Sequence, residues 1–183
     1  MYPTLENIRE IAAKGQYKRV PVCREVYADR YTPVEVMRTL RKASRHCYLL
    51  ESASQTEVWG RYSFLGYEPV MEITCTDGYM KIRHTEVGND EVVTKQVAHP
   101  GDTLREILKE YKSPVIEDMP PFTGGLVGYF SYDYGRKQMG VPSGEKDLVT
   151  VPEAVLTFYD CFIIEDCQEK RTYLVSNGIS ADA

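Results

Sequence analysis

The sequence lacks an excess of positive charge and has no long hydrophobic run. It contains 22 Lys and Arg residues against 27 Asp and Glu residues, a net charge of −5. A chain with this balance has no global basic field to attract nucleic acid. No apolar run approaches the roughly 18 residues that span a bilayer, and Met1–Glu6 lacks the basic region and apolar core of a signal peptide. We therefore expect a cytoplasmic protein without nucleic-acid or membrane partners.

Patterned cysteines and histidines are also lacking. The five cysteines are odd in number, and their spacing fits neither a disulfide framework nor a zinc template. We expect reduced and mostly buried thiols. The three histidines, His46, His84 and His99, are scattered without the spacing of paired ligands. These absences leave no evident catalytic or metal-binding set in the sequence, and a lone Gly-Gly-x-x-Gly near residue 124 is not a nucleotide fingerprint.

Three helices are predicted from caps and apolar spacing. Thr4 can cap a helix that ends near Gly15, and Thr32-Pro33-Val34-Glu35 is a capping box with proline at the first helical position. Thr103-Leu104-Arg105-Glu106 is a second capping box, followed by apolar residues at helical spacing. The polar segment 134–150 is expected to be a loop with one helical turn.

Strands dominate the rest of the chain. Alternating apolar residues predict strands at 20–26, 46–53, 61–67, 71–75, 79–83 and 92–97, with hairpin turns at Asp77-Gly78 and Asn89-Asp90. The glycine-rich segment 124–130 is expected to be a central strand, and 155–164 one nearly continuous central strand before a last strand at 171–176. We predict a single α+β domain over residues 1–183, with antiparallel sheet layers and helices packed on their outer faces.

The most unusual stretch is Leu49-Leu50-Glu51-Ser52, followed nine residues later by Arg61-Tyr62-Ser63-Phe64-Leu65-Gly66. Two apolar residues run directly into an acid and a hydroxyl. A buried carboxylate without a partner is costly, so such a strand end indicates a polar pocket. The second stretch alternates as a half-buried strand. The two stretches together predict one wall of a small-molecule site.

Both stretches resemble component I of anthranilate synthase, a chorismate-utilising enzyme family that also includes aminodeoxychorismate synthase and isochorismate or salicylate synthases. Two further segments agree in order, Pro121–Asp133 and Val151–Leu156. The resemblance covers nearly the whole chain, but only the amino-terminal part of the family. It implies one half of a large two-layered β structure with helices outside.

The resemblance also implies a regulatory site for L-tryptophan. In feedback-controlled members, the strand that resembles Leu50-Glu51-Ser52 contributes to the tryptophan pocket, and the serine is most closely tied to inhibition. Ser52 and Glu51 can bind the polar end of the amino acid, and Tyr62 can flank the indole. Arg61 can meet the ligand carboxylate or pair with Glu51. The expected tryptophan-binding residues are therefore Leu50, Glu51, Ser52, Arg61 and Tyr62.

The family's catalytic residues belong to its carboxy-terminal half and have no counterpart here, so we expect no catalysis by this chain alone. Mg²⁺, the catalytic half and a glutamine amidotransferase subunit are implied for the full-length enzyme only. The alternatives are the equivalent region of aminodeoxychorismate synthase component I and a stand-alone amino-acid sensor or interaction module. A fragment would expose apolar surface and could form a homodimer through it.

Overall fold

The computed structural model describes residues 1–28, 30–52, 60–85, 91–142 and 151–179. The chain divides into two compact units. The first unit comprises Met1–Pro69, Leu108–Gly125 and Tyr159–Ala183, and the second comprises Val70–Ile107 and Leu126–Phe158. The prediction of one domain over residues 1–183 stays a prediction.

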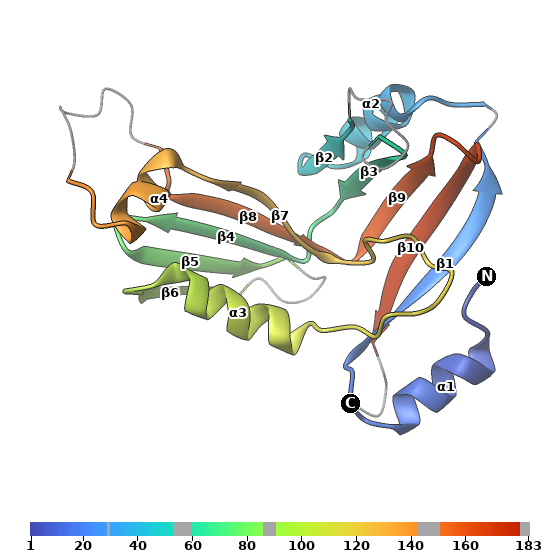
Figure 1. Ribbon diagram of the computed structural model, residues 1–183, viewed down its shortest axis with the longest axis horizontal. Helices are drawn as coiled ribbons and strands as arrows, with labels where there is room; N and C mark the ends of the chain where they lie inside the picture. The colour runs from blue at the N-terminus through green and yellow to red at the C-terminus, as the bar shows by residue number, and fades with distance from the viewer. Residues whose placement is uncertain (29, 53–59, 86–90, 143–150, 180–183) are drawn as a thin grey trace. The chain divides into compact units, whose positions relative to one another are not determined.

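The first unit is built on a five-stranded antiparallel sheet (Figure 1). Its strands, in spatial order, are β1 (Arg19–Tyr27), β10 (Arg171–Ile179), β9 (Cys161–Asp166), β3 (Tyr62–Tyr67) and β2 (Cys47–Leu50). Leu65, Phe162, Ile164 and Val175 are almost fully buried and form the core of this sheet. In this order β2 is an edge strand of the sheet, β3 pairs with it, and β9 pairs with β3.

Two helices of the first unit begin at the predicted caps. Helix α1 (Leu5–Ala13) packs on β1, and the Thr4 hydroxyl accepts a hydrogen bond from the Asn7 N–H. Helix α2 (Pro33–Ala43) packs on β2 and β3, and both hydrogen bonds of the Thr32–Glu35 capping box are present. Both caps satisfy backbone N–H groups that have no partner inside the helix.

The second unit contains another five-stranded sheet. Its spatial order is β6 (Val92–Gln96), β5 (Tyr79–His84), β4 (Met71–Thr76), β8 (Ala154–Tyr159) and β7 (Gly125–Phe130). The first three strands form the predicted meander, and Asp77 and Gly78 both have positive φ, as a two-residue hairpin turn requires. Helix α4 (Tyr132–Gln138) belongs to this unit, and helix α3 (Pro100–Glu110) begins in it and ends among the residues of the first unit. The α+β class with antiparallel sheets is confirmed.

Two predictions about helices were wrong. α3 begins at Pro100 rather than behind a cap at Thr103, because proline suits the first helical position and the Asp102 N–H bonds to the His99 carbonyl. Thr103 is instead a buried residue of the helix. α4 forms a helix of seven residues where a loop with one helical turn was expected, because the Ser131 hydroxyl caps it by accepting from the Tyr134 N–H; residues 139–142 follow it without regular structure. Residues 143–150 of that loop prediction lie outside the described residues.

Two predictions about strands were also wrong. The continuous strand over 155–164 is two strands, since the chain leaves the second sheet after Tyr159 and enters the first at Cys161. Asp160 between them is buried, and its carboxylate pairs with Arg19. The glycine-rich strand β7 is an edge strand of the described sheet, not a central one. The turn at Asn89-Asp90 lies outside the described residues.

The cysteines match the prediction in part. All five thiols are free, but only Cys23 and Cys75 are buried, and Cys167 is exposed. None of the helices in the described ranges is long and apolar enough to cross a membrane.

Candidate functional site

The predicted tryptophan-binding residues lie at one end of the first sheet, where β2 ends and β3 begins. The two strands lie side by side (Figure 1) and pair antiparallel, with Leu50 opposite Phe64. Glu51 and Ser52 follow directly after β2, and both are exposed. Arg61 directly precedes β3. The strand pairing thus brings the two unusual sequence stretches to the same end of the sheet.

Arg61 is held at this end by a carboxylate of the neighbouring strand β9. Its Nε and Nη2 atoms lie 2.9 and 2.7 Å from Oδ2 of Asp166. Oδ1 of Asp166 accepts hydrogen bonds of 3.1 Å from the backbone N–H groups of Gln168 and Glu169. Burial alone would raise the pKa of the Asp166 carboxyl, but these hydrogen bonds outweigh it and hold that pKa below its ordinary value.

Aromatic rings line the face of the sheet that carries Leu50. Residues opposite one another in an antiparallel pair share a face, so Leu50 and Phe64 lie on the same side. The Phe64 ring is 6.1 Å from that of Tyr62 and 5.8 Å from that of Phe122. The Arg61 guanidinium lies over the Tyr62 ring at 5.1 Å. We call this side the aromatic face; Leu50 is 52% exposed on it.

Acidic and hydroxyl groups occupy the opposite side, which we call the acidic face. Ser63 is paired with Glu165 of β9, and both are buried. The Glu165 carboxylate makes no hydrogen bond or ion pair with another described residue. Burial, and then the charge of Glu51, raise the pKa of the Glu165 carboxyl. Glu51 itself follows β2 directly and is exposed.

The structure thus places the predicted site residues at one end of the sheet. Leu50 and Tyr62 lie on the aromatic face, where Arg61 also pairs with Asp166, and Glu51 is exposed directly after β2. Ser52 is exposed at the end of β2. The possible ion pair of Arg61 with Glu51 was wrong: among the described residues Arg61 pairs with Asp166, which the neighbouring strand β9 places beside it. Trp59 and the rest of 53–59 lie outside the described residues.

The sequence did contain a signal for the two acids of β9 that prediction missed. Ile163-Ile164-Glu165-Asp166 repeats the pattern of Leu49-Leu50-Glu51-Ser52, in which an apolar pair runs directly into an acid. Only the occurrence near residue 50 was interpreted as a strand end with a polar pocket. Both occurrences end at the same end of the first sheet.

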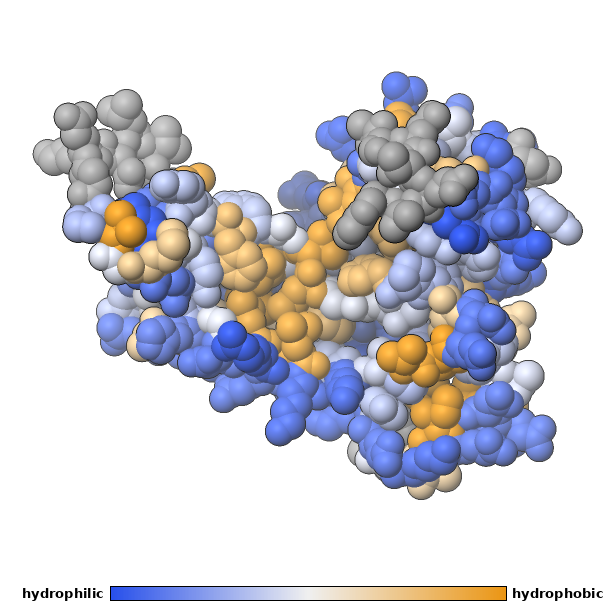
Figure 2. Space-filling view, in the orientation of Figure 1, coloured by the Kyte–Doolittle hydropathy of each residue, from blue (hydrophilic) through white to orange (hydrophobic). Residues whose placement is uncertain are grey.

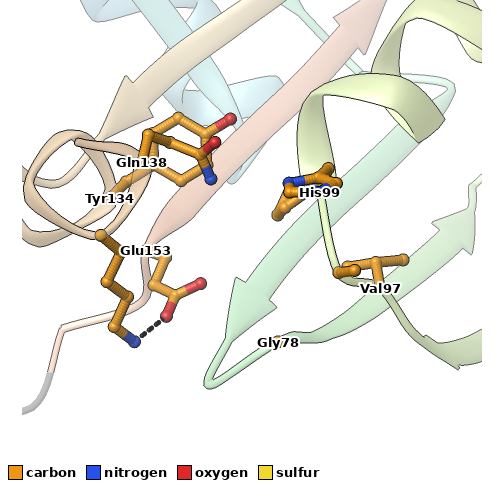
Figure 3. Close-up of a pocket in the computed structure, with 9 residues that line it drawn as sticks. Gly78, Val97, His99, Tyr134, Gln138 and Glu153 are labelled. Carbon is orange, nitrogen blue, oxygen red and sulfur yellow. Dashed lines mark hydrogen bonds and ion pairs between the residues drawn. The ribbon is translucent and has the colours of Figure 1, made fainter. Parts of the chain in front are cut away.

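A separate pocket of about 340 Å³ lies within the second unit. Figure 3 shows Tyr134 and Gln138 of α4 on one side of it and His99, just before α3, on the other. Its volume is at the lower end of the usual range for ligand pockets. The residues that line it are Gly78, Val97, Ala98, His99, Pro100, Tyr134, Lys137, Gln138 and Glu153.

Two of the charged groups that line this pocket pair with each other. Glu153 is buried, and its carboxylate forms an ion pair with Lys137 (dashed in Figure 3). The Cys75 thiol lies 3.6 Å from the second oxygen of Glu153. Burial and this carboxylate raise the pKa of the Cys75 thiol to about 11, which makes it a poor nucleophile at neutral pH. We therefore regard Lys137, Glu153 and Cys75 as structural.

The described residues do not fit the Mg²⁺ ion that the family resemblance implies. Mg²⁺ binds through carboxylate oxygens in near-octahedral geometry. Among the residues described, no three or more His, Cys, Asp or Glu side chains lie together in a way that could hold a metal ion. We assign none of these residues to the ion.

Comparison with solved structures supports the fold. The crystal structure of anthranilate synthase component I from Streptococcus pneumoniae TIGR4 matches 86% of this chain and 32% of that chain, with a TM-score of 0.52 and 21% sequence identity. At this identity the match shows the fold alone. No family model matches the sequence.

Comparison with curated proteins shows to which family the chain is related. Anthranilate synthase component 1 of Acetivibrio thermocellus is 32% identical over 176 residues, which cover 96% of this chain. The corresponding proteins of Acinetobacter calcoaceticus and Pseudomonas putida are 33% identical over 186 residues and 36% identical over 165 residues. The chain is homologous to part of anthranilate synthase component I.

The match covers only about a third of each component I relative. The aligned residues span 34% of the A. thermocellus protein, 36% of the A. calcoaceticus protein and 32% of the P. putida protein. A match of this extent is consistent with the amino-terminal region of component I. The predicted resemblance to that family is confirmed.

Proposed function

We propose that this chain is the amino-terminal, tryptophan-feedback region of an anthranilate synthase component I. The observation that carries the proposal is the meeting of Leu50–Ser52 with Arg61 and Tyr62 at one sheet end, in a chain homologous to that protein. An apolar surface, the fixed guanidinium of Arg61 and exposed polar groups lie together at this end of the sheet. These are the groups needed to bind an aromatic amino acid.

The aromatic face suits the indole ring. Leu50 is half exposed, and the rings of Tyr62 and Phe64 are tilted by 42° to each other, so an added ring can pack against an edge or a face. Arg61 uses two of its N–H groups on Asp166 and keeps others for a ligand carboxylate. Ser52 at the exposed strand end can donate to the same carboxylate. Tryptophan is thus proposed to bind across the end of β2 and β3.

The activity itself is proposed to belong to the complete enzyme. Anthranilate would be made from chorismate and from ammonia or glutamine by a component I that includes its carboxy-terminal half, Mg²⁺ and a glutamine amidotransferase subunit. This chain would then regulate the reaction without breaking bonds. Part of the tryptophan pocket is expected to come from the other half, so binding to this chain alone should be weak.

The surface of the second unit favours a region of a larger assembly over a stand-alone sensor. Tyr129 and Phe130 of the edge strand β7 are 43% and 47% exposed. Figure 2 shows the apolar surface that extends over this strand. An apolar edge strand of this kind is a usual place for another polypeptide to pack. The equivalent region of aminodeoxychorismate synthase component I remains the nearest alternative within the family.

Nuclear magnetic resonance can test weak binding directly. L-tryptophan, titrated into the ¹⁵N-labelled chain up to its solubility limit, should shift the amide signals of Leu50–Ser52 and Arg61–Phe64. Ser52→Ala should reduce the shifts, whereas Ser113→Ala, a change in a different segment, should not. Phenylalanine should cause smaller shifts, because it offers less ring surface. Signals at the sheet end that do not respond to tryptophan would rule out the proposed site.

A further inference from the structure

The pocket of the second unit is lined by three polar side chains that have no hydrogen-bond partner among the described residues. His99, just before α3, lies across the pocket from Tyr134 and Gln138 of α4 (Figure 3). Within the described ranges, no group hydrogen-bonds to the imidazole, the phenol hydroxyl or the side-chain amide of these residues. Each of the three groups can both donate and accept hydrogen bonds. Three such groups around one cavity can orient a small polar molecule.

The two sides of the pocket are fixed by regular structure. The Tyr134 ring packs against that of Phe130, with 4.8 Å between the ring centroids. Gln138 follows Tyr134 by four residues in α4, so the two side chains share one face of that helix. On the other side, the His99 carbonyl accepts a hydrogen bond of 3.1 Å from the Asp102 N–H at the start of α3. Side chains carried in this way can hold a ligand in one orientation.

The charges that line the pocket cancel. Lys137 and Glu153 form an ion pair with each other, and they are the only Lys, Arg, Asp or Glu residues among the described residues that line it. A charged ligand would lose part of its hydration there without meeting an uncompensated opposite charge, and such burial is costly. The pocket therefore favours an uncharged ligand.

The side chains also favour a planar ligand. The imidazole of His99 and the phenol of Tyr134 are on opposite sides of the pocket, and both can pack against a ring that enters between them. The Gln138 amide offers a donor beside an acceptor, which matches a ligand edge that has an acceptor beside a donor. The volume of about 340 Å³ leaves room for a molecule of one or two rings.

We propose that this pocket binds a small, uncharged heteroaromatic molecule, with its ring between Tyr134 and His99 and a polar edge at the Gln138 amide. The residues that line the pocket all belong to the second unit, whereas the proposed tryptophan site lies in the first. The two proposals can therefore fail separately. The ion pair of Lys137 and Glu153 keeps its structural role and makes the pocket electrically neutral.

Nicotinamide is a suitable probe, because it is uncharged and carries a carboxamide on a heteroaromatic ring. Titrated into the ¹⁵N-labelled chain, it should shift the amide signals of His99, Tyr134 and Gln138, with a Kd on the order of millimolar for a molecule of this size. Nicotinate has the same ring with a negative charge, and acetamide has the amide without the ring. Both should bind about fivefold more weakly or worse. If either binds as tightly as nicotinamide, or if nicotinamide shifts none of these signals, the proposal is overturned.

Conservative variants assign the contacts. Tyr134→Phe removes the hydroxyl and keeps the ring, and Gln138→Leu removes the amide. Each should weaken nicotinamide binding about fivefold, as expected for the loss of one neutral hydrogen bond. Tyr132→Phe, at an 88% exposed tyrosine of the same helix, and Gln96→Leu, at an exposed glutamine of β6, are the matched controls, since neither residue lines the pocket. Binding that is unchanged in the two pocket variants, or that falls equally in the controls, would show that nicotinamide does not bind in this pocket.

Discussion

Glu165 and Asp166 are consecutive residues of β9, lie on opposite faces of the same sheet, and have carboxyl pKa values shifted in opposite directions. Asp166 is paired with Arg61, which favours its charged form. Burial, and then the negative charge of Glu51, disfavour the charged form of Glu165. The two residues therefore make opposite contributions to the stability of the fold, and each contribution depends on pH.

Replacing Glu165 by Gln should stabilise the protein at neutral pH. The raised pKa means that the folded state binds a proton more tightly than the unfolded state does. The wild type therefore loses stability as pH rises from the ordinary glutamate pKa through the folded value. Glu165→Gln removes this loss, so its thermal midpoint should exceed that of the wild type at pH 7 and approach it in acid.

The measurement is thermal unfolding by circular dichroism at several pH values. Glu169→Gln, at an acid in the turn after β9, is the control, and its midpoint should follow the wild type at every pH. A Glu165→Gln variant that is less stable than the wild type at pH 7 would show that the carboxylate has a stabilising partner.

Replacing Asp166 by Asn should have the opposite effect. The side chain of Asp166 is fully buried, whereas that of Arg61 is 34% exposed, so solvent screens part of the pair. Asp166→Asn removes the ion pair, but the amide oxygen can still accept the hydrogen bonds from the backbone. The substitution should therefore lower the free energy of unfolding by about 2 kcal/mol. The pKa of Asp166 is lower in the folded state than in the unfolded state. The stability difference between wild type and Asp166→Asn should therefore be largest above the ordinary aspartate pKa, and it should disappear as pH falls through the pKa of the folded state.

Urea unfolding of wild type and Asp166→Asn at neutral and acid pH measures this difference. Asp102→Asn is a matched control, because Asp102 forms an exposed pair with Arg105 within one helix turn. The control should change the free energy of unfolding by less than about 0.5 kcal/mol. Equal effects of the two substitutions would contradict the role given to burial.

Local signals predicted much of the fold. The caps at Thr4 and Thr32 and the Asp77-Gly78 turn were predictable because each satisfies backbone groups within a few residues. Asp160 could not be recognised, because the apolar residues on both sides of it continue the same strand pattern. The break there depends on the distant Arg19, whose pairing with Asp160 joins residues 141 positions apart.

The candidate site was predictable in part for the same reason. The strand end at Glu51 was visible in the sequence, but which of the residues of β3 and β9 share a face with Leu50 depends on strand register. Asp166 as the partner of Arg61 is a contact across 105 residues, and no local pattern indicates it. The family resemblance predicted the ligand, but only the strand register in the structure shows which residues share a face of the sheet.

The apolar edge of β7 should cause the chain to self-associate. Tyr129 is 43% exposed on this edge strand, and the strand has unpaired backbone groups on its outer side among the described residues. Tyr129→Lys places a charge on the edge and should shift the chain toward monomer. Sedimentation velocity over a range of protein concentrations measures the change. Tyr79→Lys, at a 55% exposed tyrosine of the inner strand β5, is the control and should leave association unchanged.

Gly128 should be intolerant of any side chain, although it lies on an edge strand. A Cβ atom added there would meet the backbone carbonyl oxygen of Val155 and the Cα of Leu156, neither of which can rotate away. Gly128→Ala should therefore force β7 and β8 apart and cost roughly 1–3 kcal/mol. Gly135→Ala in α4 is the matched control, because no atom lies within 4 Å of its added Cβ. Since alanine favours helix over glycine, the control should gain up to about 1 kcal/mol. Urea unfolding of both variants tests the contrast, and a Gly128→Ala variant as stable as the control would show that β7 is not packed closely on β8.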